Sequence, residues 1–204
     1  MMEPFYDQYK DTLDELNKCA KSFDGTVVGN LFYMQNGNKI SDMMLEKRMD
    51  FCDFALNSDC IVEIGFNAGH SALLGLTANR DLIYYSIEIG QPYSEACFDI
   101  LKNRFGDRIF LTVGDSLDCV PIIKEIYPEI DSMKIGWFID GNHTSEYFKK
   151  DLDNVLALAK HGELIYLDDT NQIRIIDVLK EYFSNNIITK VKRGKRSTIV
   201  TKVV

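Results

Sequence analysis

The sequence contains no long hydrophobic run. No apolar stretch among its 204 residues reaches the ~18 residues that a membrane helix needs. The first residues, Met1 to Asp14, are acidic and lack the apolar segment of a secretory signal. Hydrophobic residues make up 46% and charged residues 26%, a balance typical of globular proteins. We therefore expect a folded cytoplasmic protein that has no membrane partner.

The cysteines form no disulfide or zinc-binding pattern. There are 5 of them, an odd number, and no two have CxxC spacing. Neither a disulfide framework nor a zinc site is expected, and a reducing compartment fits this usage.

An excess of positive charge is also missing. The net charge is -8, which repels polyphosphate, so nucleic acid is not expected as a partner. Basic residues do gather near the end of the chain, at Lys190, Lys192, Arg193, Lys195, Arg196 and Lys202. They fit either a solvated hairpin whose edge is protected by charge or a patch for an anionic substrate. The alternation at 190–192 favours the hairpin.

No repeat and no Pro/Gly/Ser-rich linker divides the chain, so we expect one domain over residues 1–204. Helical spacing predicts a helix over 4–21, and residues 25–41 resemble a loop. We expect residues 1–41 to provide a helix and a loop that cover the substrate, with Tyr33 and Met34 shaping the pocket. A second helix is predicted over 42–57, with an apolar stripe of Met44, Leu45, Met49, Cys52, Ala55 and Leu56.

Residues 42–204 are predicted to form a Rossmann-like core in which strands alternate with helices. The expected strands are 60–64, 82–88, 109–113, 135–140 and 164–168. The expected helices between and after them are 69–78, 92–104, 116–126, 144–160 and 171–183. This alternation predicts a parallel sheet with helices on both faces. Residues 186–192 and 197–203 flank a short turn and must pair antiparallel. The fold class is therefore α/β, with a seven-stranded, mostly parallel sheet that ends in an antiparallel hairpin.

The strongest local signal is ExGxxxGxS, formed by Glu63, Gly65, Gly69 and Ser71, which follows a strand and opens a helix. Glycines let the backbone approach a ligand closely, and the helix N-terminus supplies free N–H groups. The position two residues after Gly65 is Asn67, so the GxGxxG pattern of dinucleotide-binding oxidoreductases is absent.

Three further polar signals lie at predicted strand ends. Glu88 comes 23 residues after Gly65 and could accept both hydroxyls of a ribose, or could be a solvated acid. Gly114-Asp115-Ser116 follows the third strand, where Asp115 or Ser116 could also cap a helix. Asp140 ends the fourth strand. Open α/β sheets bind ligands at this edge, so the signals support one another.

Together these motifs resemble those of class I S-adenosylmethionine-dependent methyltransferases, over roughly residues 40–204. The resemblance implies S-adenosylmethionine as cofactor. The residues that it assigns to cofactor binding are Glu63, Gly65, Asn67, Gly69, Ser71, Glu88, Gly114, Asp115, Ser116 and Asp140.

A trio of aspartates predicts a metal site. Asp140 ends the fourth strand and Asp168-Asp169 ends the fifth, so the three could converge on Mg²⁺ or Ca²⁺. This arrangement resembles the metal-dependent O-methyltransferases of the catechol/caffeoyl-CoA and macrocin types. Residues 139–143 also resemble a methyltransferase family with an IDGxH pattern. Alternatively, Asp168 and Asp169 cap the following helix and Asp140 faces the cofactor.

His143 lies three residues after Asp140, where the catechol type has a lysine as general base. A histidine, with an ordinary pKa near 6.5, could serve there at neutral pH, or could orient the substrate or cap a helix. With Asp140 and His143 as catalytic residues, we predict metal-assisted methylation of a small hydroxylated molecule. The alternatives are a metal-independent N- or O-methyltransferase that uses His143 and a cofactor-binding protein without turnover. The resemblance also suggests a homodimer, since the family often forms dimers.

Overall fold

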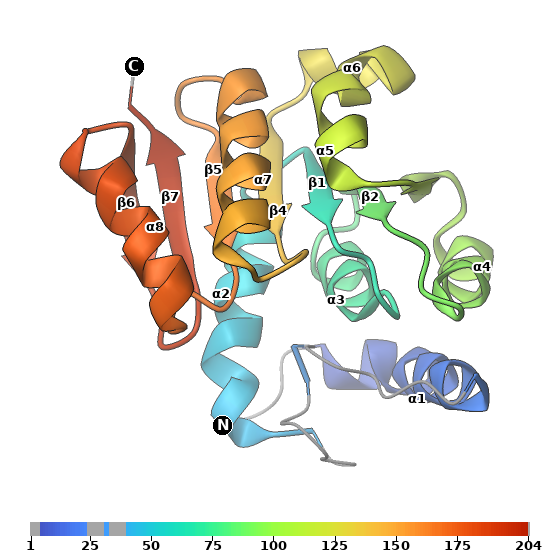
Figure 1. Ribbon diagram of the computed structural model, residues 1–204. Helices are drawn as coiled ribbons and strands as arrows, with labels where there is room; N and C mark the ends of the chain where they lie inside the picture. The colour runs from blue at the N-terminus through green and yellow to red at the C-terminus, as the bar shows by residue number, and fades with distance from the viewer. Residues whose placement is uncertain (1–4, 24–30, 33–39, 204) are drawn as a thin grey trace.

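The computed structural model describes residues 5–23, 31–32 and 40–203, and these contain one seven-stranded sheet (Figure 1). The strand order is β3-β2-β1-β4-β5-β7-β6. The strands are β1 (Cys60–Ile64), β2 (Ile83–Glu88), β3 (Ile109–Val113), β4 (Ile135–Ile139), β5 (Leu164–Leu167), β6 (Ile188–Arg193) and β7 (Thr198–Lys202). Strands β1 to β5 are parallel, whereas β7 pairs antiparallel with both β5 and β6. The predicted fold class is confirmed.

Helices cover both faces of the sheet (Figure 1). One side carries α2 (Leu45–Leu56), α3 (His70–Ala78) and α4 (Ser94–Phe105), and α1 (Tyr6–Ser22) packs on α3 and α4. The other side carries α5 (Ser116–Cys119), α6 (Ile123–Ile126), α7 (Ser145–Leu158) and α8 (Ile173–Ser184). Short 3₁₀ helices lie at Asp42–Met44, Gly106–Arg108, Val120–Ile122 and Pro128–Ser132. None of the helices in the described ranges combines the length and the hydrophobicity of a membrane span.

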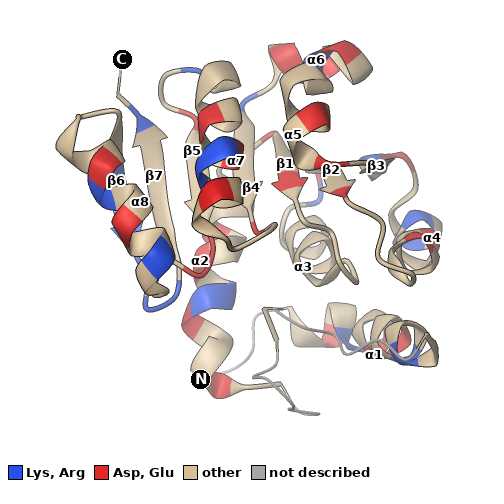
Figure 2. Cartoon of the chain, viewed as in Figure 1, with Lys and Arg blue, Asp and Glu red and all other residues tan. Residues whose placement is uncertain are grey.

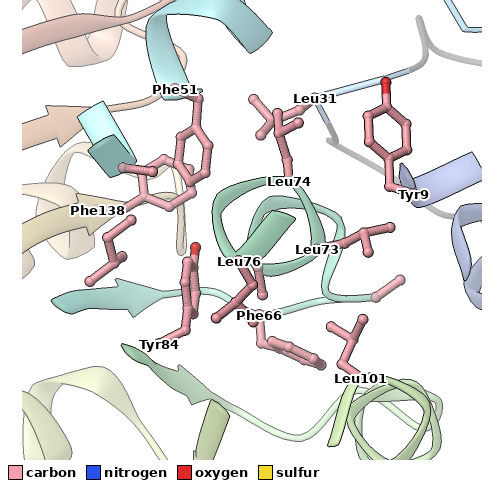
Figure 3. Close-up of a cluster of buried hydrophobic side chains, with 14 of the residues drawn as sticks. Tyr9, Leu31, Phe51, Phe66, Leu73, Leu74, Leu76, Tyr84, Leu101 and Phe138 are labelled. Carbon is pink, nitrogen blue, oxygen red and sulfur yellow. The ribbon is translucent and has the colours of Figure 1, made fainter. Parts of the chain in front are cut away.

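Two apolar cores lie on opposite sides of the sheet because successive side chains of a strand point to opposite faces. Tyr84 and Phe138 face the side of α3, where they meet Phe51, Phe66 and Leu74 (Figure 3). Their sequence neighbours Tyr85 and Trp137 belong to the core under α7. Since the central strands are buried on both faces, they appear in the sequence as continuous apolar runs.

The prediction of one continuous helix over 116–126 is wrong. The segment consists of α5, a 3₁₀ turn over Val120–Ile122 and α6. Pro121 lies in the middle and has no backbone N–H to donate, so a continuous helix would lose a hydrogen bond there.

The apolar stripe predicted for α2 is also partly wrong. Met49 and Leu56 are 44% and 55% exposed, whereas Lys47, Arg48 and Asp50 are buried. Buried charges require partners. Arg48 donates to the carbonyl oxygens of residues 31 and 41 at 3.0 and 3.1 Å, and the partners of the other two are described below. The buried face of α2 is thus partly polar, because it lies against charged groups from distant parts of the chain.

Ion pairs connect the basic hairpin of β6 and β7 to α2, and Figure 2 colours the basic and acidic residues along the chain. The Lys192 ammonium lies 2.7 Å from Asp50 Oδ1, and the Lys195 ammonium lies 3.7 Å from Glu46 Oε2. The basic residues thus lie on a hairpin, as the alternation favoured, and two of them pair with acids of α2, which the sequence did not predict.

Most of the loop expected to cover the substrate, including Tyr33 and Met34, lies outside the described residues. Within it, Leu31 and Phe32 are described and both are buried.

Candidate active site

A cavity of about 400 Å³ opens at the carboxyl ends of β1, β2 and β4. Its walls come from the segments that follow these strands and β3, as expected for an open α/β sheet. Nine of the residues predicted as site residues line it: Gly65, Asn67, Ser71, Glu88, Gly114, Asp115, Ser116, Asp140 and His143. The size is within the range of clefts that hold small ligands.

Gly65 allows the turn after β1 to pass directly against the end of β4. Its φ is +97°, in the region that favours glycine, and a Cβ there would lie 2.3 Å from the carbonyl oxygen of Asp140. No other residue fits this position without displacing one of the two segments. The glycine therefore sets the distance between the turn after β1 and the end of β4.

The Glu88 carboxylate is held in place by the backbone of two turns. Its Oε2 accepts the N–H of Asn67 at 2.7 Å, and its Oε1 accepts the N–H of Gly90 at 3.2 Å. Asn67, at φ +52°, is fixed in turn by the hydroxyl of Tyr93, which donates to its Oδ1 at 2.7 Å. Glu88 is only 4% exposed but lines the cavity, so its remaining lone pairs can accept the hydroxyls of a bound ribose.

Two residues of the glycine motif lie behind the cavity wall rather than in it. Glu63 is fully buried and accepts hydrogen bonds from the hydroxyls of Ser71 and Ser86. Burial raises the pKa of its carboxyl to about 7. Gly69 precedes α3, and a Cβ on it would lie 2.6 Å from side-chain atoms of Leu101 and Phe66. Both residues support the turn instead of lining the cavity, contrary to the contacts predicted for them.

Asp115 caps α5 and also lines the cavity. Its Oδ1 caps α5 by accepting the N–H of Leu117 at 2.9 Å, and its Oδ2 accepts the Tyr147 hydroxyl at 3.3 Å. The neighbouring Ser116 hydroxyl donates to Asp151 at 2.6 Å. Asp115, Ser116 and Tyr147 all line the cavity, so the capping contacts fix polar groups at its wall.

Asp140 and His143 lie together on the cavity wall. His143 Nε2 is 3.3 Å from Asp140 Oδ1 and 3.9 Å from Asp169 Oδ2. The contact with the Asp140 carboxylate raises the pKa of His143 above its ordinary value. Burial, together with the charge of Asp168, raises the pKa of Asp140 well above its ordinary value.

Asp168 and Asp169 follow β5 but do not line the cavity. Asp168 Oδ2 lies 2.6 Å from the ammonium of Lys47, and both side chains are buried. Burial opposes the ionisation of Asp168, yet the charge and hydrogen bond of Lys47 outweigh it and lower the pKa of this carboxyl. Asp169 Oδ1 lies 4.0 Å from the guanidinium of Arg196.

The three aspartates gather at neighbouring strand ends, but they do not form the predicted metal site. Each already faces a basic side chain: Lys47, His143 or Arg196. Across residues 5–23, 31–32 and 40–203, no three His, Cys, Asp or Glu side chains are arranged to hold a metal ion. The donor set therefore does not fit a divalent cation in this arrangement.

The sequence did not identify Lys47 as a residue of the site, nor Leu31 and Ile89 as apolar residues that line the cavity. One signal could have found it: Lys47 lies four residues before Phe51 and eight before Ala55, and both of these are fully buried. A lysine in phase with a buried stripe requires an anionic partner.

Comparison with known proteins agrees with this geometry. The sequence matches the family described as a methyltransferase domain over residues 62–170, more than half of the chain. No curated protein matches it.

Solved structures share the fold at low sequence identity. A cofactor-bound protein from MTB is 16% identical with a TM-score of 0.67, over 100% of this chain and 98% of that one. An O-methyltransferase from Bacillus cereus in complex with SAH is 14% identical with a TM-score of 0.60, over 95% and 91%. The MycE methyltransferase of the mycinamycin biosynthetic pathway, in complex with Mg and SAH, is 14% identical with a TM-score of 0.56, over 92% and 54%.

The family match covers the glycine turn, Glu88, Asp115 and Asp140, which the fold brings to one cavity. The chain therefore belongs to the methyltransferase domain family and is a class I, S-adenosylmethionine-dependent methyltransferase.

Proposed function

We propose that this enzyme transfers the methyl group of S-adenosylmethionine to a hydroxyl of a small molecule, with His143 as the proton acceptor. The observation that carries the proposal is that His143, backed by Asp140, lines the same cavity as Glu88 and the glycine turn. A base is thereby present beside the cofactor site. The similarity in fold to an O-methyltransferase bound to SAH supports the choice of a hydroxyl acceptor.

The residues of the cavity fit this cofactor. Gly65 brings backbone close to the ligand, and Glu88 offers a fixed carboxylate for the ribose. Asp115 and Ser116 lie on the wall where the resemblance places the adenine. When bound, the cofactor supplies an electrophilic methyl group on a sulfonium. The C–S electron pair stays on sulfur as the new O–CH₃ bond forms.

His143 would remove the proton of the acceptor hydroxyl. His143 Nε2 lies 3.3 Å from Asp140 Oδ1, so the two side chains interact electrostatically, and the neutral imidazole offers one ring nitrogen that can accept a proton. The imidazolium that forms would be stabilised by the Asp169 carboxylate, 3.9 Å away, and by Asp140 in its ionised form. General base catalysis of this kind contributes about 10²- to 10⁴-fold in rate.

Mg²⁺ or Ca²⁺ was expected to assist the deprotonation, as the trio of aspartates suggested. A structure of similar fold has Mg bound together with SAH. In this chain, however, the three carboxylates face basic side chains, and the proposed mechanism uses no metal ion.

We further propose that Leu31 and Phe32, which precede α2, help to cover the acceptor in the cavity. Leu31 lines the cavity, and its carbonyl oxygen is held by the guanidinium of Arg48 at 3.0 Å. The Phe32 ring contacts the rings of Tyr9 and His70, with centroids 5.2 and 5.9 Å apart. These contacts connect the segment before α2 to the first residue of α3.

The test has two stages. Isothermal titration of the full chain should show saturable binding of S-adenosylmethionine, and mass spectrometry after incubation with a panel of small phenols and sugar alcohols should find an added methyl group. Replacement of His143 with Asn should leave cofactor affinity unchanged but lower kcat by about 10²- to 10⁴-fold. His161→Asn, an exposed histidine away from the cavity, is the matched control. Absence of cofactor binding, or full turnover in His143→Asn, would contradict the proposal.

A further inference from the structure

Lys47 is a buried cation whose anionic partner lies across the fold. It belongs to α2, and its ammonium donates to Asp168 Oδ2 at 2.6 Å, across 121 residues of sequence. The side chains are 8% and 4% exposed, so water screens this pair little. Asp140 and Asp169 are the other acids that interact with the ammonium. Lys47 thus supplies positive charge to all three aspartates that end β4 and β5.

The ammonium and a divalent ion would compete for the same oxygen. Mg²⁺ needs carboxylate oxygens at about 2.0–2.1 Å in a near-octahedral set. Asp168 Oδ2 is already the acceptor of the Lys47 ammonium, and an ion bound there would lie against a fixed positive charge. Lys47 cannot move aside easily because its helix is fixed by neighbouring contacts: Arg48 to two backbone carbonyls and Asp50 to Lys192.

A second observation concerns the carboxylate oxygen of Asp168 that the Lys47 ammonium does not contact. Asp168 Oδ1 is buried and has no hydrogen-bond partner among the described residues. A carboxylate with one oxygen bound to an ammonium and the other free could ligate an ion if the ammonium were removed. The two remaining aspartates lie close enough to share a histidine, as His143 Nε2 contacts both.

We infer that the Lys47 ammonium takes the place of a divalent cation at the ends of β4 and β5, so that methyl transfer by this enzyme needs no metal. It follows that removal of the ammonium opens Asp140, Asp168 and Asp169 to a divalent ion. Lys47 is a positioning residue, because it does not line the cavity and acts on Asp140 and His143 through Asp168. The statement about turnover rests on the proposed function, whereas the statement about metal binding does not.

The experiment compares metal binding by the full chain before and after loss of the ammonium. Mn²⁺ and Mg²⁺ are titrated into chelator-treated wild type, Lys47→Met and Lys47→Gln, with binding followed by calorimetry and by the Mn²⁺ paramagnetic resonance signal. Lys180→Met, an exposed lysine of α8 that pairs with Asp177, is the matched control. We expect Lys47→Met to bind Mn²⁺ at least about 10-fold more tightly than wild type. The double variant Lys47→Met, Asp168→Asn should lose that gain, and Lys180→Met should behave as wild type.

Turnover of the wild type in excess chelator tests independently whether methyl transfer needs a metal ion. We expect unchanged kcat and KM with and without added Mg²⁺. Two results would each overturn the inference: chelator-sensitive turnover restored by Mg²⁺, or Mn²⁺ binding in Lys47→Met no tighter than in Lys180→Met. If Lys47→Met does not fold, Lys47→Gln replaces it. The inference can also be refuted without either variant: wild type would have to bind the metal ion, and Asp168→Asn would have to lose that binding. Failure of the proposed function would appear separately, as a wild type that does not bind S-adenosylmethionine, and the metal titrations would remain decisive for Lys47.

Discussion

Replacing Glu63 with Gln should change how the stability of the protein depends on pH. Glu63 is fully buried beneath the cofactor turn, where it accepts hydrogen bonds from Ser71 and Ser86. Glutamine has nearly the same shape, and the two serine hydroxyls can rotate to suit its amide. The variant therefore removes an ionisable group while leaving the packing intact.

The magnitude follows from the burial of Glu63, which raises its pKa from 4.5 to about 7. Between these two pH values the folded protein holds a proton that the unfolded chain has released. The free energy of unfolding therefore falls as pH rises through this window, by about 3 kcal/mol from this group alone. Below the unfolded pKa the contribution is fully present, and above about pH 7 it is lost.

Urea denaturation of both proteins at several pH values from about 4 to about 9 measures the effect. The stability of wild type minus that of Glu63→Gln should decrease between about pH 4.5 and 7 and then stay constant. Glu95→Gln, on the exposed surface of α4, controls for the loss of a surface charge. A difference that is constant across the range, or that increases with pH, would refute the argument from burial.

Three further outcomes are expected. Glu88→Gln should weaken S-adenosylmethionine binding by about 10- to 100-fold, since a hydrogen bond to a charged group contributes about 1.5–3 kcal/mol; an unchanged calorimetric Kd would remove Glu88 from the ribose site. Gly65→Ala should lower the free energy of unfolding by about 1–3 kcal/mol or more and abolish cofactor binding. Gly162→Ala, at φ +86° with no atom within 4 Å of its Cβ, lacks the steric clash and should bind cofactor normally, so equal effects in the two variants would contradict the steric argument. Burial lowers the pKa of His70 to about 4, so the stability of wild type minus that of His70→Gln should fall by about 3 kcal/mol as pH drops from 6.5 to 4, and a constant difference in the same urea series would contradict this.

Much of the fold could be predicted from the sequence because its signals are local. The strands β1 and β3 occur at the residues predicted for them. Burial on both faces makes β1 a short, mostly apolar run, and the edge strand β3, although mostly half-buried, is also rich in apolar residues. The hairpin followed from the short turn between its strands. Among the helices, α2 was placed correctly but its buried face was not, because the partners of Lys47 and Asp50 lie far along the chain.

The sequence could predict which strand ends form the site, but it could not predict which side chains contact one another there. Gly65, Glu88 and Asp140 could be brought together because parallel strands end at the same edge of the sheet. The alternation of a strand cannot tell whether an acid such as Glu63 faces a ligand or a covering helix. The pairing of Lys47 with Asp168 could not be predicted either, because it depends on how α2 lies across the sheet.

The close approach of Gly65 to the carbonyl oxygen of Asp140 has a mechanical consequence. The turn after β1 and the end of β4 are in direct backbone contact, with no room between them for even one more carbon. In the proposed mechanism the first segment holds the methyl donor and the second leads to the proton acceptor. Because the two segments touch, a shift of one should displace the other. Any natural variant that enlarges residue 65 would have to withdraw the tip of β4, and His143 would retreat from the reacting methyl group with it.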